Sequence, residues 1–211
     1  MHKNHQLFVQ YFLPFAHLLQ HHLKYTLGYD PIKPTLKTIE GLKNAKDVMD
    51  FVGRQLTENN TLLFQYNVGA DEKNSSVNVL VFSQGGLGMP DRDYYLKTDA
   101  ATTIIQQKYQ TYIQDILKLV GTDSVTATKQ MMAIYNLEKL LAISHKTNVE
   151  LRDPQSNYNK KSIANLQKIM PVFDWVGLTK TLGVTVDSVN ISQPVFYAKV
   201  NELLTTSFKI S

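Results

Sequence analysis

The chain has 211 residues, of which 43% are hydrophobic and 19% charged, an ordinary composition for a globular protein of one or two domains. Its 22 Lys and Arg residues exceed its 18 Asp and Glu residues by only four, and no long run of like charges occurs, so a nucleic-acid-binding surface and a polybasic membrane anchor are disfavoured. The absence of cysteine excludes disulfides, thiolate zinc sites and cysteine nucleophiles.

The beginning of the chain is apolar but interrupted. Residues 7–19 read LFVQYFLPFAHLL, with Gln10 and Pro14 inside the run. This stretch is too short to span a bilayer, and no small-residue cleavage site of a signal peptide follows it. We therefore expect no membrane segment here, but an amphipathic or partly buried helix that bends near Pro14.

The next segment changes period from helix to strand. Apolar spacings of three and four residues predict helices over 35–41 and 45–57. Two short runs rich in β-branched and aromatic residues, 63–68 and 77–82, then predict strands. Because the polar stretch GADEKNSS lies between them, we expect a β-hairpin with a long connection.

The rest of the chain is predicted to be helical. Amphipathic patterns or helix start and stop residues indicate helices over 102–120, 126–144, 162–170 with Ser162 as cap, 174–182 and 195–206, with one brief extended segment over 184–191. The predicted fold class is a single, mainly α domain carrying one small antiparallel β-hairpin.

The histidines offer weak metal-site candidates. His17 and His21 have the i, i+4 spacing that places two imidazoles on one helical face. The metalloprotease version of this motif needs a Glu after the first His, and Leu18 stands there instead, so a surface histidine cluster is favoured. Glu138 and His145 are interpreted in the same way, as a solvated pair.

Other catalytic patterns are incomplete. Asp71, Asp91 and Asp93 lack the offsets of a calcium loop, and QGGLG lacks the Lys-Ser/Thr of a phosphate-binding loop. No Ser-His-Asp grouping can be assigned, since the histidines are almost all N-terminal. The sequence therefore predicts no catalytic, cofactor-binding or metal-binding residue in this chain.

The densest turn chemistry is the stretch QGGLGMPDRDYYL, residues 84–96. Its glycines permit close backbone approach, Pro90 fixes its own φ angle, and Asp91, Arg92 and Asp93 can bind backbone groups. A catalytic loop is one interpretation. A rigid crossover from sheet to helix is favoured, because no nucleophile or metal set accompanies the stretch.

Several motifs follow one another in order over about residues 27 to 204. The first two segments consist of Phe64, Val68, Asp71, Lys73, Asn74, Ser75 and Asn78, and then of Gln84, Gly86, Leu87, Pro90, Arg92, Asp93, Tyr94 and Tyr95. Later motifs are Leu137-Glu138, Leu141-Ala142, Arg152-Asp153-Pro154, Tyr158-Asn159-Lys160 and Phe173-Asp174-Trp175. In this order they resemble the N-terminal region of the neprilysin family of zinc metallopeptidases, which includes the endothelin-converting enzymes and related bacterial oligoendopeptidases.

The resemblance implies a function for the parent family rather than for this chain alone. Family members are zinc endopeptidases whose helical N-terminal lobe covers the active-site cavity, and they usually act outside the cytoplasm. Their zinc-binding H-E-x-x-H motif does not occur in this sequence, so zinc is expected in the full-length parent and none in this chain. Residues 26–211 are expected to form part of the lobe, while residues 1–25 do not match the family. The implied partners are a peptide substrate and the missing catalytic domain.

The residues that match the family motifs are expected to hold the lobe together. They are Arg92, Asp93, Tyr94, Tyr95, Arg152, Asp153 and Trp175. Arg92 and Asp93 are predicted to attach the hairpin to the helices, with Arg152 and Asp153 acting similarly at a second turn. The alternative function is a stand-alone helical module that binds a peptide or protein without catalysis. Apolar surface exposed in such a piece would favour self-association.

Overall fold

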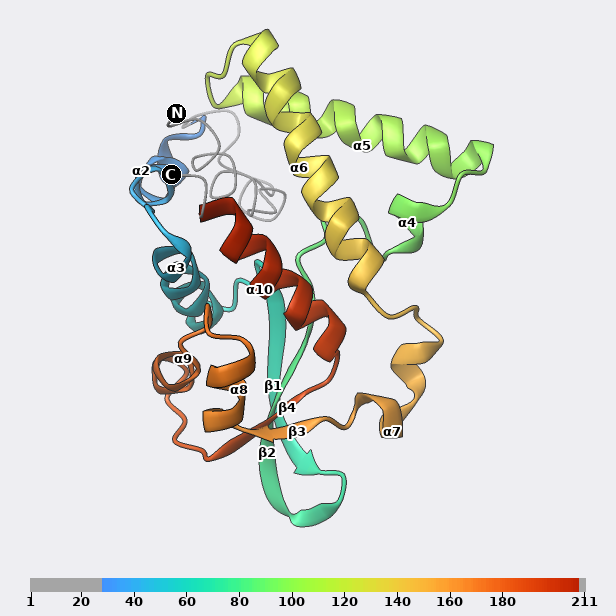
Figure 1. Ribbon diagram of the computed structural model, residues 1–211. Coiled ribbons are helices and arrows are strands. Elements are labelled where there is room, and N and C mark those ends of the chain that lie inside the picture. The colour runs from blue at the N-terminus through green and yellow to red at the C-terminus, as the bar shows by residue number, and fades with distance from the viewer. Residues whose placement is uncertain (1–27, 209–211) are drawn as a thin grey trace. The chain divides into compact units, whose positions relative to one another are not determined.

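The computed structural model of the protein describes residues 28–208 (Figure 1). These residues form two compact units, each built from two stretches of chain. Unit 1 contains residues 28–42 and 87–143, and unit 2 contains residues 43–86 and 144–208. Within the described residues, no helix is both long enough and apolar enough to cross a membrane.

Unit 1 is entirely helical within the described residues. A 3-10 turn, η1 (Asp30–Ile32), leads into α2 (Lys33–Glu40), and a one-turn helix, α4 (Asp93–Leu96), precedes the long helices α5 (Ala100–Leu119) and α6 (Ser124–Ser144), of which Ser144 already belongs to unit 2. Asp99 starts α5, because its side chain accepts a hydrogen bond from the Thr102 amide at 3.0 Å. Gly121 ends it with a φ of 95°, a left-handed conformation that glycine adopts without strain.

Unit 2 is built around a mixed four-stranded sheet (Figure 1). Its strands are β1 (Phe64–Asp71), β2 (Asn74–Gln84), β3 (Lys160–Ser162) and β4 (Ser188–Ile191), in the spatial order β1-β2-β4-β3. β1 and β2 are antiparallel, β2 and β4 are parallel, and β4 and β3 are antiparallel.

The fold-class prediction was therefore incomplete: the mainly helical class is confirmed, but the hairpin is one half of a larger sheet. The long polar connection was also wrong. Both strands extend through GADEKNSS and leave a two-residue turn at residues 72–73. Apart from the buried Asp71, the polar residues there are exposed at the end of the hairpin, so no run of apolar residues marks this part of the strands.

Helices cover the sheet of unit 2. They are α3 (Ala45–Thr57), α8 (Ile163–Ile169), α9 (Trp175–Thr181) and α10 (Pro194–Phe208), while η2 (Glu150–Arg152) and the one-turn α7 (Pro154–Asn157) lie in the segment before β3. As predicted, Ser162 caps α8 by accepting a hydrogen bond from the Asn165 amide.

An aromatic cluster forms the core between these helices and the sheet. Trp175 is fully buried, stacks on Phe173 at 4.8 Å between ring centroids, and meets Phe82 of β2 edge-on at 5.8 Å. Tyr197 of α10 packs against Phe64 of β1. Large aromatic side chains bury much apolar area per residue, so this cluster stabilises the packing of α9 and α10 on the sheet.

Candidate functional site

A buried carboxylate in unit 1 is the most unusual chemical group in the described chain. Glu138 of α6 is 7% exposed. The Tyr95 hydroxyl of α4 donates to its Oε2 at 2.9 Å, and the Tyr109 hydroxyl of α5 donates to its Oε1 at 2.9 Å. One carboxyl group therefore joins three consecutive helices, through partners that lie 43 and 29 residues before it in the sequence.

The turn before α4 completes this cluster, which we call the Glu138 cluster: Glu138, Tyr95, Tyr109, Gly88 and Met89. The Met89 amide donates to the Tyr95 hydroxyl at 2.9 Å, so that hydroxyl both accepts and donates. A Cβ atom at Gly88 would overlap the Tyr109 hydroxyl. The backbone thus approaches the phenol so closely that only glycine fits.

Burial controls the ionisation of the cluster. Desolvation raises the pKa of Glu138 to about 7, although hydrogen bonds from Tyr95, Tyr109 and the Gly88 amide act in the opposite direction. Burial first, and the neighbouring carboxylate second, raises the pKa of Tyr95 and of Tyr109. A carboxyl group with a pKa near 7 could serve as a general base. Here both of its oxygens are bonded to phenols and it is shielded from solvent, so the geometry favours a structural tie.

The interpretation of Glu138 and His145 as a solvated pair is wrong. Both side chains are 7% exposed, and each has its own buried environment. A ring nitrogen of His145 lies 3.0 Å from the Gly85 carbonyl oxygen, and the ring packs edge-on against Phe196 in unit 2.

A second buried carboxylate joins the hairpin of unit 2 to the segment around β3. Asp71 is 2% exposed; Lys160 Nζ lies 2.6 Å from its Oδ2, and the Tyr158 hydroxyl donates to its Oδ1 at 3.0 Å. The Lys73 amide adds a third hydrogen bond at 2.9 Å. The hydrogen bond from Lys160, followed by that from the Lys73 amide, lowers the pKa of Asp71 to about 2, so it is ionised at neutral pH.

Paired amide contacts fix the end of β2. The Gln84 side chain donates to the Lys146 carbonyl at 3.1 Å and accepts from the Lys146 amide at 2.8 Å. The Gln84 amide in turn donates to Gln193 Oε1 at 2.8 Å. These three residues bind the strand end to the segment after α6 and to the start of α10.

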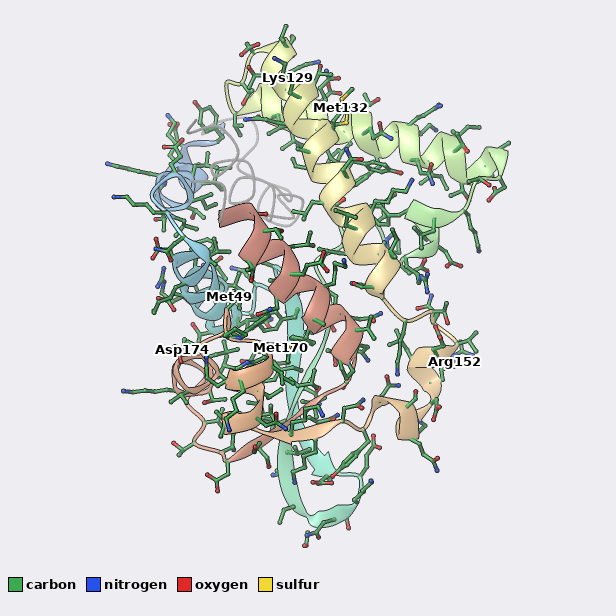
Figure 2. The ribbon with its side chains drawn as sticks, in the orientation of Figure 1. Met49, Lys129, Met132, Arg152, Met170 and Asp174 are labelled. Carbon is green, nitrogen blue, oxygen red and sulfur yellow. The ribbon has the colours of Figure 1, made fainter. Side chains whose placement is uncertain are left out.

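The four charged residues among the predicted structural positions differ in their contacts. Arg92 is half-buried, and its Nε has no hydrogen-bond partner among residues 28–208. Asp93 pairs with Lys97, one turn further along, at 2.9 Å. Asp153 caps α7 by accepting from the Gln155 amide at 3.0 Å, and Arg152 is exposed beside it in η2 (Figure 2). The predicted attachment of the hairpin by Arg92 and Asp93 stays a prediction.

The predicted aromatic positions lie in packed surroundings. Tyr95 is 1% exposed within the Glu138 cluster, and Tyr94 packs against the apolar group formed by Met89, Tyr95 and Ala142. The Trp175 indole nitrogen donates to the Met170 carbonyl at 3.3 Å inside the core of unit 2. The motif matches marked Glu138, Asp71, Tyr158 and Lys160, but they did not indicate which residues touch. The contacts of Glu138 with two phenols, and of Asp71 with Tyr158 and Lys160, were therefore not predicted.

Between residues 28 and 208, no three His, Asp or Glu side chains converge as a metal-binding group, so the residues present do not fit a zinc site. The His17 and His21 pair lies outside the described residues.

Comparison with known proteins defines the class of this fold and its motifs. The sequence profile of the N-terminal domain of Peptidase family M13 matches residues 15–210. The chain belongs to this family, and the resemblance inferred from its motifs is confirmed.

Relatives extend well beyond the matched region. Endothelin-converting enzyme 1 of Bos taurus is 32% identical over 153 residues, which is 69% of this chain and 20% of the relative. Endothelin-converting enzyme-like 1 of Mus musculus is 39% identical over 115 residues, 54% of this chain and 15% of the relative. The chain thus spans about a fifth of the length of the relatives it matches.

Solved structures show the same fold. The zinc metalloprotease Zmp1 of Mycobacterium tuberculosis, crystallised with an inhibitor, matches 98% of this chain and 30% of its own with a TM-score of 0.78 and 24% identity. PepO of Lactobacillus rhamnosis matches 94% of this chain and 31% of its own, with a TM-score of 0.69 and 18% identity.

Proposed function

We propose that this chain is part of the lobe that covers the active-site cavity of an M13 zinc metalloendopeptidase, and that it carries no peptidase activity by itself. The observation that carries this proposal is the family match over residues 15–210, combined with a fold that corresponds to 30% of Zmp1. In this proposal the chain shapes the cavity and selects peptides. Zinc and the reacting groups belong to another part of the parent protein.

The contacts of the described residues support a scaffold role. Glu138 and Asp71, the two buried carboxylates, are each bonded to side chains of other elements and shielded from solvent. A carboxylate that acts on a peptide must reach the scissile bond or its attacking water. These two groups instead fix the relative positions of helices and strands within their own units.

A stand-alone interaction module is the second candidate function. It is favoured by the apolar side chains that α5 and α6 expose, such as Leu119 and Val125, each at 66%. Such side chains favour association with another protein where they form a contiguous patch.

The DNA that follows the codon for Ser211 separates the two candidates. The lobe proposal predicts an H-E-x-x-H motif in a reading frame that continues or closely follows this one. Its absence from every downstream frame would contradict the lobe proposal and favour the interaction module.

A further inference from the structure

The outer face of α5 carries a symmetric pattern of exposed residues. α5 is 20 residues long, but Ile113 is its only buried residue. Ile104 and Leu119 are 51% and 66% exposed, and Lys108 and Asp115 lie exposed between them. At 100° per residue all four project within a sector of about 60°.

The spacing of these residues is the same from both ends of α5, while the charges at the two inner positions are opposite in sign. Ile104 lies four residues before Lys108, and Leu119 lies four residues after Asp115. If a second copy of α5 runs antiparallel across a twofold axis between Thr111 and Tyr112, each Ile104 faces a Leu119. Each Lys108 then faces an Asp115 of the other copy, twice across the axis, because a twofold contact is self-complementary.

We propose that this face of α5 is a homodimer contact, in which two copies of the chain pair antiparallel through Ile104, Lys108, Tyr112, Asp115 and Leu119. The apolar ends supply the burial that drives association, and the two Lys108–Asp115 pairs set the direction and register. Tyr112 is 43% exposed and stacks on Tyr109, and it lies beside the twofold axis, at about 80° from Ile104 and so at the edge of the contact. This inference goes beyond the proposed function and does not depend on it.

The local charges are compatible with this pairing. Asp115 has an intramolecular partner, Lys118, at 3.6 Å, and the two side chains are 59% and 39% exposed. That pair is weak in solvent, so Asp115 can also accept a Lys108 ammonium of the second copy. A contact between two single helices is smaller than a standard protein interface, and we expect a weak, reversible dimer.

Charge reversal provides the test. Sedimentation equilibrium of the 211-residue protein, from low micromolar to several hundred micromolar, should show a monomer–dimer equilibrium. Lys108→Asp and Asp115→Lys should each weaken the dimer by roughly tenfold, because like charges then face each other twice. The double variant K108D/D115K should restore it, and an equimolar mixture of the two single variants should form a heterodimer.

Lys129→Asp is the matched control, since Lys129 is exposed on α6 near Met132 (Figure 2), and it should leave the equilibrium unchanged. Circular dichroism of each variant verifies that the helices are intact. A monomer at every concentration would overturn the proposal, as would association that ignores the charge reversals or responds to Lys129→Asp instead. A monomer that binds a longer M13 chain through this face would also overturn it.

Discussion

Replacing Glu138 by Gln tests whether ionisation of the buried carboxyl group lowers the free energy of unfolding. The structure raises the pKa of this group from 4.5 to about 7. A rise of that size corresponds to roughly 3 kcal/mol, because each tenfold change in acid dissociation is worth about 1.4 kcal/mol. Between those two pH values the folded state holds the proton more tightly than the unfolded state. The free energy of unfolding of the wild type therefore falls as pH rises from 4.5 to about 7, and stays lowered above it.

The glutamine side chain of the Glu138→Gln variant cannot ionise, so the variant lacks this loss. We expect the free energy of unfolding of the variant, relative to that of the wild type, to rise by up to roughly 3 kcal/mol between about pH 5 and about pH 8. Urea unfolding followed by far-ultraviolet circular dichroism, at a series of pH values, measures the difference. Glu202→Gln is the matched control, since Glu202 is an exposed residue of α10 and its loss changes the net charge equally. A difference in free energy of unfolding between the wild type and Glu138→Gln that stays constant over this pH range would refute the reasoning.

Three further variants test the buried contacts. Tyr95→Phe removes the hydroxyl that joins the Met89 amide to Glu138, and should lower the free energy of unfolding by about 1–3 kcal/mol, whereas Tyr112→Phe at an exposed position should change it little. Gly88→Ala should lower it by about 1–3 kcal/mol in thermal or urea unfolding, because the added methyl group must displace the Tyr109 hydroxyl; the control Gly69→Ala meets only one atom, at 3.7 Å, and an equal loss there would contradict the packing argument. Asp71 has a pKa lowered from 3.8 to about 2, so its contribution to stability is present above pH 3.8 and is lost as pH falls through about 2. Asp71→Asn should lack that acid-induced loss in urea unfolding measured between about pH 5 and about pH 2, and an acid dependence equal to that of the wild type would count against the Lys160 contact.

Local patterns were sufficient to predict most helices. The helix over Ala45–Thr57 was predicted with the bounds that the structure shows, since its apolar residues recur every three to four positions. The cap at Ser162 followed from residue type and place alone.

The sheet could be predicted only in part, because half of it rests on pairing between distant segments. β3 is three polar residues long and has no strand signal of its own. β4 meets β2 at only two register positions, Val81 with Asn190 and Phe82 with Ile191. The hydrophobic periodicity within one segment does not predict that it pairs with the other.

The Glu138 cluster was missed for a similar reason. A single acidic residue in an amphipathic helix is usually solvated, so Glu138 was placed at the surface. Its partners Tyr95 and Tyr109 lie 43 and 29 residues earlier in the chain. The family motifs contain both Tyr95 and Glu138, but a motif match does not reveal which of its residues touch.

The central claim is that this chain is scaffold and that the chemistry of the family resides elsewhere. It is tested most directly by assaying one purified sample for bound zinc and for cleavage of a quenched fluorogenic peptide, with added zinc and with a chelator. The account predicts no stoichiometric zinc and no hydrolysis above the rate of the buffer. Hydrolysis that requires zinc, stops with the chelator and elutes together with the protein would contradict it.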